Sequence, residues 1–261
     1  MKTKKLNPIQ ECLLVWSLHD LFVSLVHHGV HKSDSESNLV ISEKKVLVAN
    51  LALQINQPSL PELIRRFLYD QQYPDCPLTS ANVTLHACPP FAGMISVFAL
   101  ATASYYTPSD PSGVCGIHRE HIRATPSWRQ GPAHYDCTFV NSNLELDRDS
   151  MHGLRIARIL LFFSFVFDDK TYPCALVHWF SPSAKECDED TGMWMVQPEV
   201  EDDGSPTISV LHLDRIFRAT HLLPIYGDDP IGSISPHDSL DVFHAFYVNK
   251  YIDHHAFQIA S

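Results

Sequence analysis

Two long apolar runs flank a short acidic segment, and this pattern constrains the fold more than any other feature of the chain. Residues 155–167 and 172–180 lie on either side of Asp168-Asp169-Lys170-Thr171, a sequence typical of a hairpin turn. In the first run apolar residues recur at every second position, and the other face carries Arg158 and Ser164 among apolar residues. The pattern predicts two antiparallel strands with one face fully buried and the other partly covered. The residues expected to share the buried face are Ala157, Ile159, Leu161, Phe163, Phe165 and Phe167.

From about residue 82, short apolar runs alternate with clusters of Pro, Gly, Asp and Ser, which is typical of a barrel or sandwich. The chain has 261 residues, of which 45% are hydrophobic, enough to bury a core in one large domain or two small ones. The sequence therefore predicts an α+β protein whose residues 82–227 form a small, mainly antiparallel β-barrel. The expected strands are 83–88, 94–106, 117–124, 135–140, 155–167, 172–180, 192–197 and 207–213.

Helices are expected on both sides of the barrel, with residues 1–81 forming a helical N-terminal lead and residues 228–261 a C-terminal helix that packs on the barrel. Ser59 and Glu62 form a capping box in front of the clearest helix, and Pro74 lies just beyond its end. The apolar positions recur at helical spacing in all three segments. They are Leu14, Leu18, Leu21, Phe22 and Leu25; Leu60, Leu63, Ile64, Phe67 and Leu68; and Leu240, Phe243, Phe246, Tyr247 and Tyr251.

Charge and cysteine content narrow the classes of partner and compartment. Lys and Arg number 19 against 30 Asp and Glu, a net charge of −11, which argues against direct DNA binding because DNA-binding proteins neutralise phosphates with surplus cations. No stretch reaches the roughly 18 apolar residues that span a bilayer. The N-terminal Lys residues resemble a signal peptide, but Glu11 and Asp20 interrupt the apolar stretch that follows. Seven cysteines without a CxxC indicate a reducing compartment, either nuclear or cytoplasmic, rather than secretion.

Several long strings resemble the C-terminal, post-catalytic part of transposases of fungal DNA transposons, of the Plavaka and Kyakuja-Dileera-Zisupton kind. The resemblance covers about residue 58 to the end. The strings are LPELIRRFLYDQ (60–71), YTPSDPSG (106–113), REHIRATPSWRQGPAHYDCTFVN (119–141), RILLFFSFVFDDKTYPCALVHWF (158–180), DEDTGMWMVQPE (188–199), VLHLDRIFRATHLLPIYG (210–227) and DSLDVFHAFYVNKYIDHHAF (238–257).

The resemblance implies a transposon-derived protein without catalytic activity, because such transposases carry their acidic, metal-binding core upstream of this region. The implied role is an interaction module of the nucleus whose partner is a protein, either a transposase or a chromatin-associated protein. The order of the strand strings is also similar to bromo-adjacent-homology and Tudor-type barrels. A degenerate relic without present function is an alternative that the sequence does not separate from this one.

A short segment carries the spacing of a zinc site. Cys115, His118 and His121 are soft ligands three residues apart, and Cys137 or His134 would have to supply the fourth ligand. In a strand, however, His118 points away from the other two, so the competing interpretation is a strand of mixed exposure. A zinc-stabilised binding module is therefore the alternative function, and no cofactor is expected otherwise.

Two further sets of residues are candidate partner sites. Arg119, His121 and Arg123 share one face of a predicted strand, with Trp128 and Arg129 in the following loop, and this basic stripe could hold phosphate or an acidic peptide. The competing interpretation is a solvated face paired with the acidic loops. The second set could form an aromatic cage for a cationic side chain, although aromatic residues on barrel strands usually belong to the core. Its members are Trp179, Phe180, Trp194 and Tyr226.

Catalysis has little support in the sequence. The paired carboxylates at 168–169, 189–190 and 202–203 lie in turn and loop signals, where solvated acids are the rule. Metal-dependent phosphoryl transfer needs carboxylates that converge from different elements. HExxH, GxSxG, the P-loop and GxGxxG are all absent from the sequence, so we expect a protein that is not an enzyme.

Overall fold

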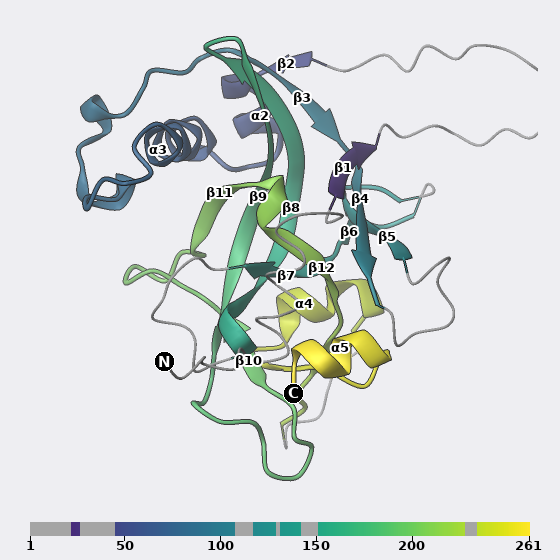
Figure 1. Cartoon of the computed structure of the whole chain (residues 1–261). Helices are drawn as coiled ribbons and strands as arrows, with labels where there is room; N and C mark the ends of the chain where they lie inside the picture. The colour runs from purple at the N-terminus through teal and green to yellow at the C-terminus, as the bar shows by residue number, and fades with distance from the viewer. Residues whose placement is uncertain (1–21, 27–44, 108–116, 129–130, 142–150, 228–233) are drawn as a thin grey trace, which may run out of the picture.

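The computed structural model describes residues 22–26, 45–107, 117–128, 131–141, 151–227 and 234–261 (Figure 1). These residues form a mixed α+β fold with few helices, and the strand pairs are antiparallel. The predicted α+β class is therefore confirmed. A closed barrel is not confirmed, because the end strands of the larger sheet do not pair with each other in the part of the chain that is described. The sheet is a curled half-barrel.

The larger sheet is built around the predicted hairpin. Its main path is β12 (Ile216–Thr220), β7 (Cys137–Asn141), β8 (Leu154–Phe167), β9 (Lys170–Pro182), β10 (Met195–Pro198), β14 (Phe246–Val248) and β13 (Leu222–Pro224). Three more strands join this path at its side: β11 (Ile208–His212) pairs with β9, β3 (Met94–Phe98) pairs with β8, and β2 (Lys45–Leu47) pairs with β3.

The predicted hairpin turn between β8 and β9 is confirmed at Asp168 and Asp169, whereas Lys170 and Thr171 of the predicted turn already belong to β9. Asp168 and Asp169 have φ of 48° and 59°, the left-handed geometry of a type I′ turn. The prediction of a single buried face is wrong, because a β-bulge shifts the register between Ile159 and Leu161. Ala157 and Ile159 therefore pack in one core cluster, whereas the members of the predicted face that follow the bulge pack in another. These later side chains are Leu161, Phe163, Phe165 and the partly buried Phe167.

A smaller sheet lies beside the hairpin, with the order β1 (Phe22–Val26), β4 (Leu100–Tyr106), β5 (Ile117–Thr125) and β6 (His134–Tyr135). The segment predicted as one strand over 94–106 breaks at Ala99, so that β3 joins the larger sheet and β4 the smaller. The segment predicted over 135–140 breaks at Asp136 into β6 and β7 in the same way. The two sheets thus part at these two residues, where backbone hydrogen bonds from Ala124 N to Ala99 O (2.9 Å) and from Ile159 N to Asp136 O (2.9 Å) still join them.

Helices α2 (Val48–Gln54) and α3 (Leu60–Gln72) cover one face of the hairpin, and the smaller sheet lies on its other side (Figure 1). The predicted helix α3 is confirmed, with Leu60, Ile64 and Leu68 fully buried. The capping box is wrong, because Ser59 has helical torsions (φ −75°, ψ −13°) and its side chain caps nothing. Glu62 instead accepts hydrogen bonds from Arg66 Nε and Nη2 at 2.9 and 2.8 Å.

Two other predicted elements differ from the structure. Residues 83–88 are not a strand; short 3₁₀ turns at Ser80–Asn82 and Leu85–Ala87 replace it. Arg65 of α3 donates hydrogen bonds to the carbonyl oxygens of Leu85, Cys88 and Pro89. The expected helix over Leu14–Leu25 is also wrong where the structure describes it, since Phe22–Val26 is strand β1, paired with β4. Residues 14–21 of that helix lie outside the described part.

The predicted C-terminal helix is wrong as a single element. The segment forms a 3₁₀ turn (Pro236–Asp238), α4 (Ser239–Val242), β14 and α5 (His254–Ile259). Strand β14 lies between β10 and β13, and Phe246 and Val248 are completely buried there. Joining two ladders at once buries the apolar residues of this segment more fully than a surface helix would, so tertiary packing overrides helical periodicity.

Candidate functional site

An apolar groove of about 810 Å³ opens where the two sheets part. Its lining includes Val97 of β3, Ala99 between β3 and β4, Ala124 near the end of β5, and Leu160 in the middle of β8. Leu160 is the residue of the β-bulge, whose extra residue is left out of the ladder. One wall is the end of α2 and the turn to α3, residues 54–57. The groove thus follows from two strand irregularities that coincide in space.

Apolar side chains in the groove are only partly covered by the rest of the protein. Val46, Ile55, Val97 and Leu160 pack against the core cluster beneath helices α2 and α3, yet all four remain half-buried rather than fully buried. Water-accessible apolar surface gathered in a concavity is the usual character of a ligand-binding or peptide-binding site. The volume lies in the range of such sites, roughly 300–1,000 Å³.

An ion pair closes one end of the groove. Arg158 Nη1 and Nη2 donate to the two carboxylate oxygens of Asp241 at 2.5 and 3.1 Å, and the guanidinium lies 5.5 Å from the centre of the Tyr135 ring. The Arg158 side chain is 12% exposed, whereas Asp241, on α4, is 61% exposed. A second hollow of about 300 Å³ lies beyond the pair, and Tyr135, Arg158 and Asp241 line both hollows. The pair is therefore the partition between them.

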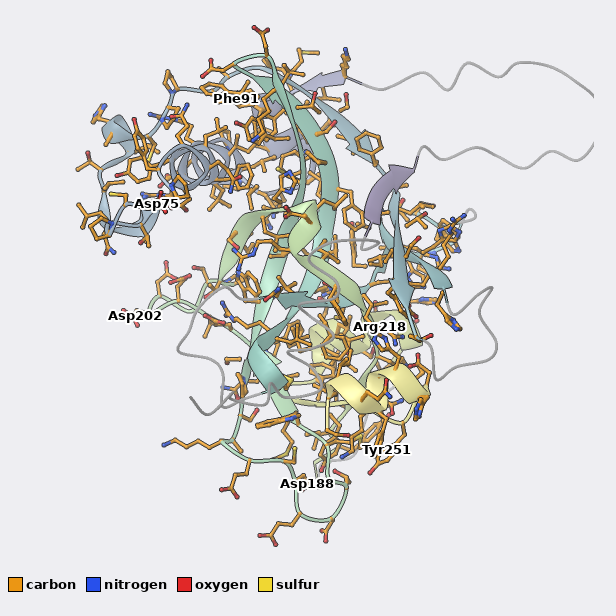
Figure 2. All side chains as sticks on the ribbon, in the orientation of Figure 1. Asp75, Phe91, Asp188, Asp202, Arg218 and Tyr251 are labelled. Atoms are coloured by element: carbon orange, nitrogen blue, oxygen red, sulfur yellow. The ribbon has the colours of Figure 1, made fainter. Side chains whose placement is uncertain are left out.

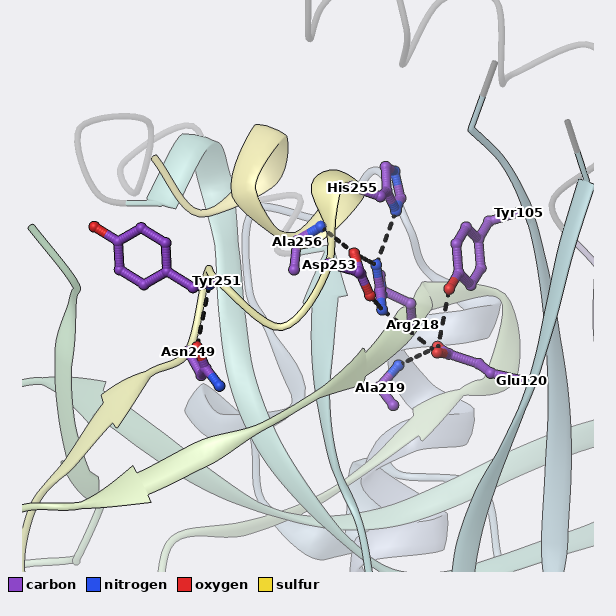
Figure 3. Close-up of polar contacts among 9 residues, drawn as sticks. All are labelled: Tyr105, Glu120, Arg218, Ala219, Asn249, Tyr251, Asp253, His255 and Ala256. Atoms are coloured by element: carbon purple, nitrogen blue, oxygen red, sulfur yellow. Dashed lines mark hydrogen bonds and ion pairs between the residues drawn. The ribbon is translucent and has the colours of Figure 1, made fainter. Parts of the chain in front are cut away.

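A buried polar cluster around Arg218 is the other concentration of charge (Figure 3). Arg218 of β12 is 4% exposed and makes a two-point contact with Asp253, at 2.9 and 2.6 Å. Its guanidinium also lies 3.6 Å from a carboxylate oxygen of Glu120 on β5, and the other oxygen of Glu120 accepts a hydrogen bond from the backbone N–H of Ala219 at 2.5 Å. The cluster therefore joins both sheets to the start of α5.

Aromatic rings and shifted pKa values mark the same cluster. His255 stacks on Tyr105 at 4.9 Å between ring centres, and the Arg218 guanidinium lies 4.8 Å from that tyrosine ring. Burial, together with the charge of Arg218, lowers the pKa of His255 to about 4. Burial alone would raise the pKa of Asp253, but hydrogen bonds from Arg218 outweigh it and lower the pKa to about 2. Burial raises the pKa of Glu120 and of Tyr105.

The charged groups of the Arg218 cluster are paired with one another. Each charged group of the cluster faces an opposite charge or a hydrogen-bond partner within it, as buried charges require. Asp253 additionally caps α5 by accepting a hydrogen bond from Ala256 N at 2.7 Å. None of these residues lines either of the two hollows. The cluster thus fixes the C-terminal segment against the sheets.

The candidate basic stripe lies on β5 and is partly engaged within the protein. Arg119 and His121 are exposed, and Thr102 Oγ1 lies 3.1 Å from His121 Nδ1. Arg123 lies 5.0 Å from the centre of the Trp128 ring and 3.5 Å from a carboxylate oxygen of Asp136. The stripe therefore carries two exposed basic side chains beside an aromatic–cation pair. Arg129 lies outside the described residues.

The candidate zinc ligands are only partly described, since Cys115 is outside the described residues. His118 and His121 lie on β5, where His118 stacks on Tyr105 at 6.0 Å between ring centres. Among the residues that the structure describes, no three His, Cys, Asp or Glu side chains are grouped as metal ligands.

The structure does not bring the four candidate cage aromatics together. Trp179 and Phe180 are neighbours on β9 and point into different core clusters, and Trp194 shares the cluster of Phe180. The indole of Trp179 donates a hydrogen bond to Ser209 Oγ at 2.7 Å, and Arg155 stacks on its ring at 4.1 Å. Tyr226 is 61% exposed and contacts Phe243 edge-on.

The paired carboxylates lie in exposed turns and loops (Figure 2). Hydrogen bonds from the side chain and backbone of Thr191 lower the pKa of Asp188 in one loop. Hydrogen bonds from Ser205 do the same for Asp203 in another. These bonds are local turn contacts within each loop.

Comparisons with known proteins add no relative. No family model matches the chain, and searches of the curated proteins and of the solved structures found no match either. In the described residues, no helix is long and apolar enough to cross a membrane.

Sequence reasoning identified neither the Arg218 cluster nor the Arg158–Asp241 pair. Arg218 stands in the apolar segment IFRAT, and a charge in a buried strand requires a buried partner, which is a signal for such a cluster. Arg158 interrupts an apolar strand in the same way. Their partners, Asp253 and Asp241, are far away in sequence, so no local pattern identifies them.

Proposed function

We propose that the chain is a non-catalytic interaction module that binds a peptide segment of another protein in the apolar groove. The observation that carries the proposal is the groove itself, an 810 Å³ concavity with half-buried apolar side chains at the junction of the two sheets. The resemblance to transposase tails supports a nuclear partner, either a transposase or a chromatin-associated protein. The curled antiparallel sheet is also compatible with kinship to Tudor-type barrels, which read peptide tails.

The dimensions and rigidity of the groove favour a peptide occupant. Its lining comes from β3, β5 and β8, which are paired in the two sheets, and from the turn between two helices, so the site is largely formed in advance. Half-buried Val46, Val97 and Leu160 offer apolar contacts from three strands, β2, β3 and β8, rather than from one. Apolar side chains of an extended segment gain free energy by removing this surface from water.

A peptide array tests the proposal. The array carries overlapping peptides of the core histones, unmodified and lysine-methylated, and of transposase catalytic domains of the kind that the chain resembles. Wild type is compared with Leu160→Asp, which places a charge in the groove, and with Val200→Asp, a matched control at a position that is 59% exposed and outside the groove.

The proposal expects a set of apolar peptides that bind wild type and Val200→Asp but not Leu160→Asp. It is refuted if no peptide binds wild type, or if Leu160→Asp retains binding while its circular dichroism and melting temperature match those of the control.

A further inference from the structure

The Arg158–Asp241 pair has the character of a contact that another carboxylate can replace. The guanidinium is held in place, 12% exposed and beside the ring of Tyr135, whereas its carboxylate partner is 61% exposed. Asp241 lies on α4, a four-residue helix of which no residue is fully buried. The position of the Arg158 guanidinium is therefore fixed by its surroundings, whereas few contacts other than the ion pair itself hold the Asp241 carboxylate.

The guanidinium also retains unused hydrogen-bonding capacity at this position. Arg158 Nε is buried and has no hydrogen-bond partner among the described residues. An arginine presents five donors in a planar fork that matches a carboxylate at two points, and Asp241 occupies only the two terminal nitrogens. Because Nε is buried, an incoming carboxylate meets Arg158 at the two terminal nitrogens, in place of Asp241 and without any change in the position of the guanidinium.

The groove places this cation at the end of an apolar surface. Leu160 lies two residues further along β8 than Arg158, and both line the same concavity together with Val97. Among the described residues that line the groove, Arg158 is the one cation and Asp241 the one anion, so an anion that replaces Asp241 meets a single complementary charge there.

We propose that the groove takes an apolar peptide segment that carries one acidic group, and that this group replaces Asp241 on Arg158. The inference rests on the proposed peptide-binding function and adds its chemical specificity. Asp241 then acts as a built-in competitor that occupies Arg158 in the free protein. Removing the competitor strengthens binding of an anionic segment, whereas removing Arg158 abolishes the preference for the anion.

Two fluorescent probes of the same shape test this specificity. 1-Anilinonaphthalene-8-sulfonate carries an anionic group, and N-phenyl-1-naphthylamine is its uncharged counterpart. Both are titrated into wild type, Asp241→Asn and Arg158→Gln. In parallel, each array peptide that carries Glu or Asp is compared with a copy that carries Gln or Asn.

The expected result is a change in anion preference alone. Asp241→Asn binds the anionic probe about tenfold more tightly than wild type, and Arg158→Gln binds it about tenfold more weakly, since a charge-assisted hydrogen bond has about this effect. The neutral probe binds all three proteins equally. The acidic peptides lose their advantage over the amide copies in Arg158→Gln only.

The outcomes separate this inference from the function on which it rests. Equal ratios of anionic to neutral affinity in all three proteins overturn the inference, and the groove proposal then stands if the neutral probe and the peptides still bind. If Asp241→Asn, an exposed and conservative change, leaves anion affinity unchanged, competition by Asp241 is refuted even where Arg158→Gln fails to fold. If the probes show the effect and no peptide does, a peptide occupant is refuted.

Discussion

Replacing Arg218 with methionine tests whether the buried cluster holds the C-terminal segment in place. The change removes the cation that faces Asp253 at 2.6 and 2.9 Å and Glu120 at 3.6 Å, and it leaves two carboxylates without a counter-charge. Methionine is long and unbranched, so it fills much of the space of the arginine stem. The change in the free energy of unfolding should therefore reflect the loss of the charge more than the loss of packing.

The magnitude follows from the shifted pKa of Asp253. A carboxyl group whose pKa is about 2 instead of 3.8 reflects about 2 kcal/mol of favourable interaction, and partial exposure of Asp253 to solvent reduces this value. The uncompensated charge of Glu120, which is about 20% exposed, adds to the cost. Breaking a buried ion pair on one side typically costs about 3–5 kcal/mol. We expect Arg218→Met to lower the free energy of unfolding by about 3 kcal/mol.

Urea unfolding at pH 7 measures this loss, with Arg119→Met as the control. Arg119 lies on β5 beside Glu120 and is exposed, so its replacement should change stability by less than about 0.5 kcal/mol. The double variant Arg218→Met with Asp253→Asn should lose less than the sum of the single losses, because the two residues interact. A loss below about 1 kcal/mol for Arg218→Met, or a loss equal to that of the control, would refute a stabilising role for the cluster.

Three further predictions concern pH, the hairpin turn and the helix start. The pKa of His255 is about 4 in the folded protein and about 6.5 in the unfolded chain, so the unfolded chain binds the proton first and the free energy of unfolding falls as the pH drops from 6.5 to 4. Over this range, urea titrations should show that His255→Phe loses about 3 kcal/mol less free energy of unfolding than wild type does. Equal losses would contradict the low pKa of His255. Replacing Asp168-Asp169 with Asn-Gly should stabilise the type I′ turn by about 1 kcal/mol, read as a higher melting temperature, and a lower one would contradict the turn type. Ser59→Ala should lower the free energy of unfolding by less than about 0.5 kcal/mol, because the Ser59 side chain caps nothing. A loss of about 1 kcal/mol in urea unfolding would indicate that Ser59 does cap α3.

The sequence predicted the elements that local pattern decides. The hairpin of β8 and β9 could be predicted because its turn and its apolar runs are adjacent, and α3 because its apolar stripe has helical period. The β-bulge at Leu160 could not be predicted, since one extra residue leaves composition unchanged and alters only which face later residues occupy.

Elements decided by distant partners escaped prediction. Phe246 and Tyr247 fit a helical stripe, and only the neighbouring strands β10 and β13 make them part of a sheet. The strand break at Ala99 likewise depends on which sheet each half joins. The candidate groove lies at that break and therefore also depends on long-range strand pairing, which no local sequence pattern indicates.

The dissociation constants of the strongest array peptide test the central claim most directly. They are measured by fluorescence anisotropy with wild type, Leu160→Asp and Val200→Asp at equal ionic strength. We predict that Leu160→Asp weakens binding by tenfold or more, about 1.4 kcal/mol, and that Val200→Asp binds as wild type does. Equal constants for all three proteins would contradict the claim that this concavity is where the protein holds its partner.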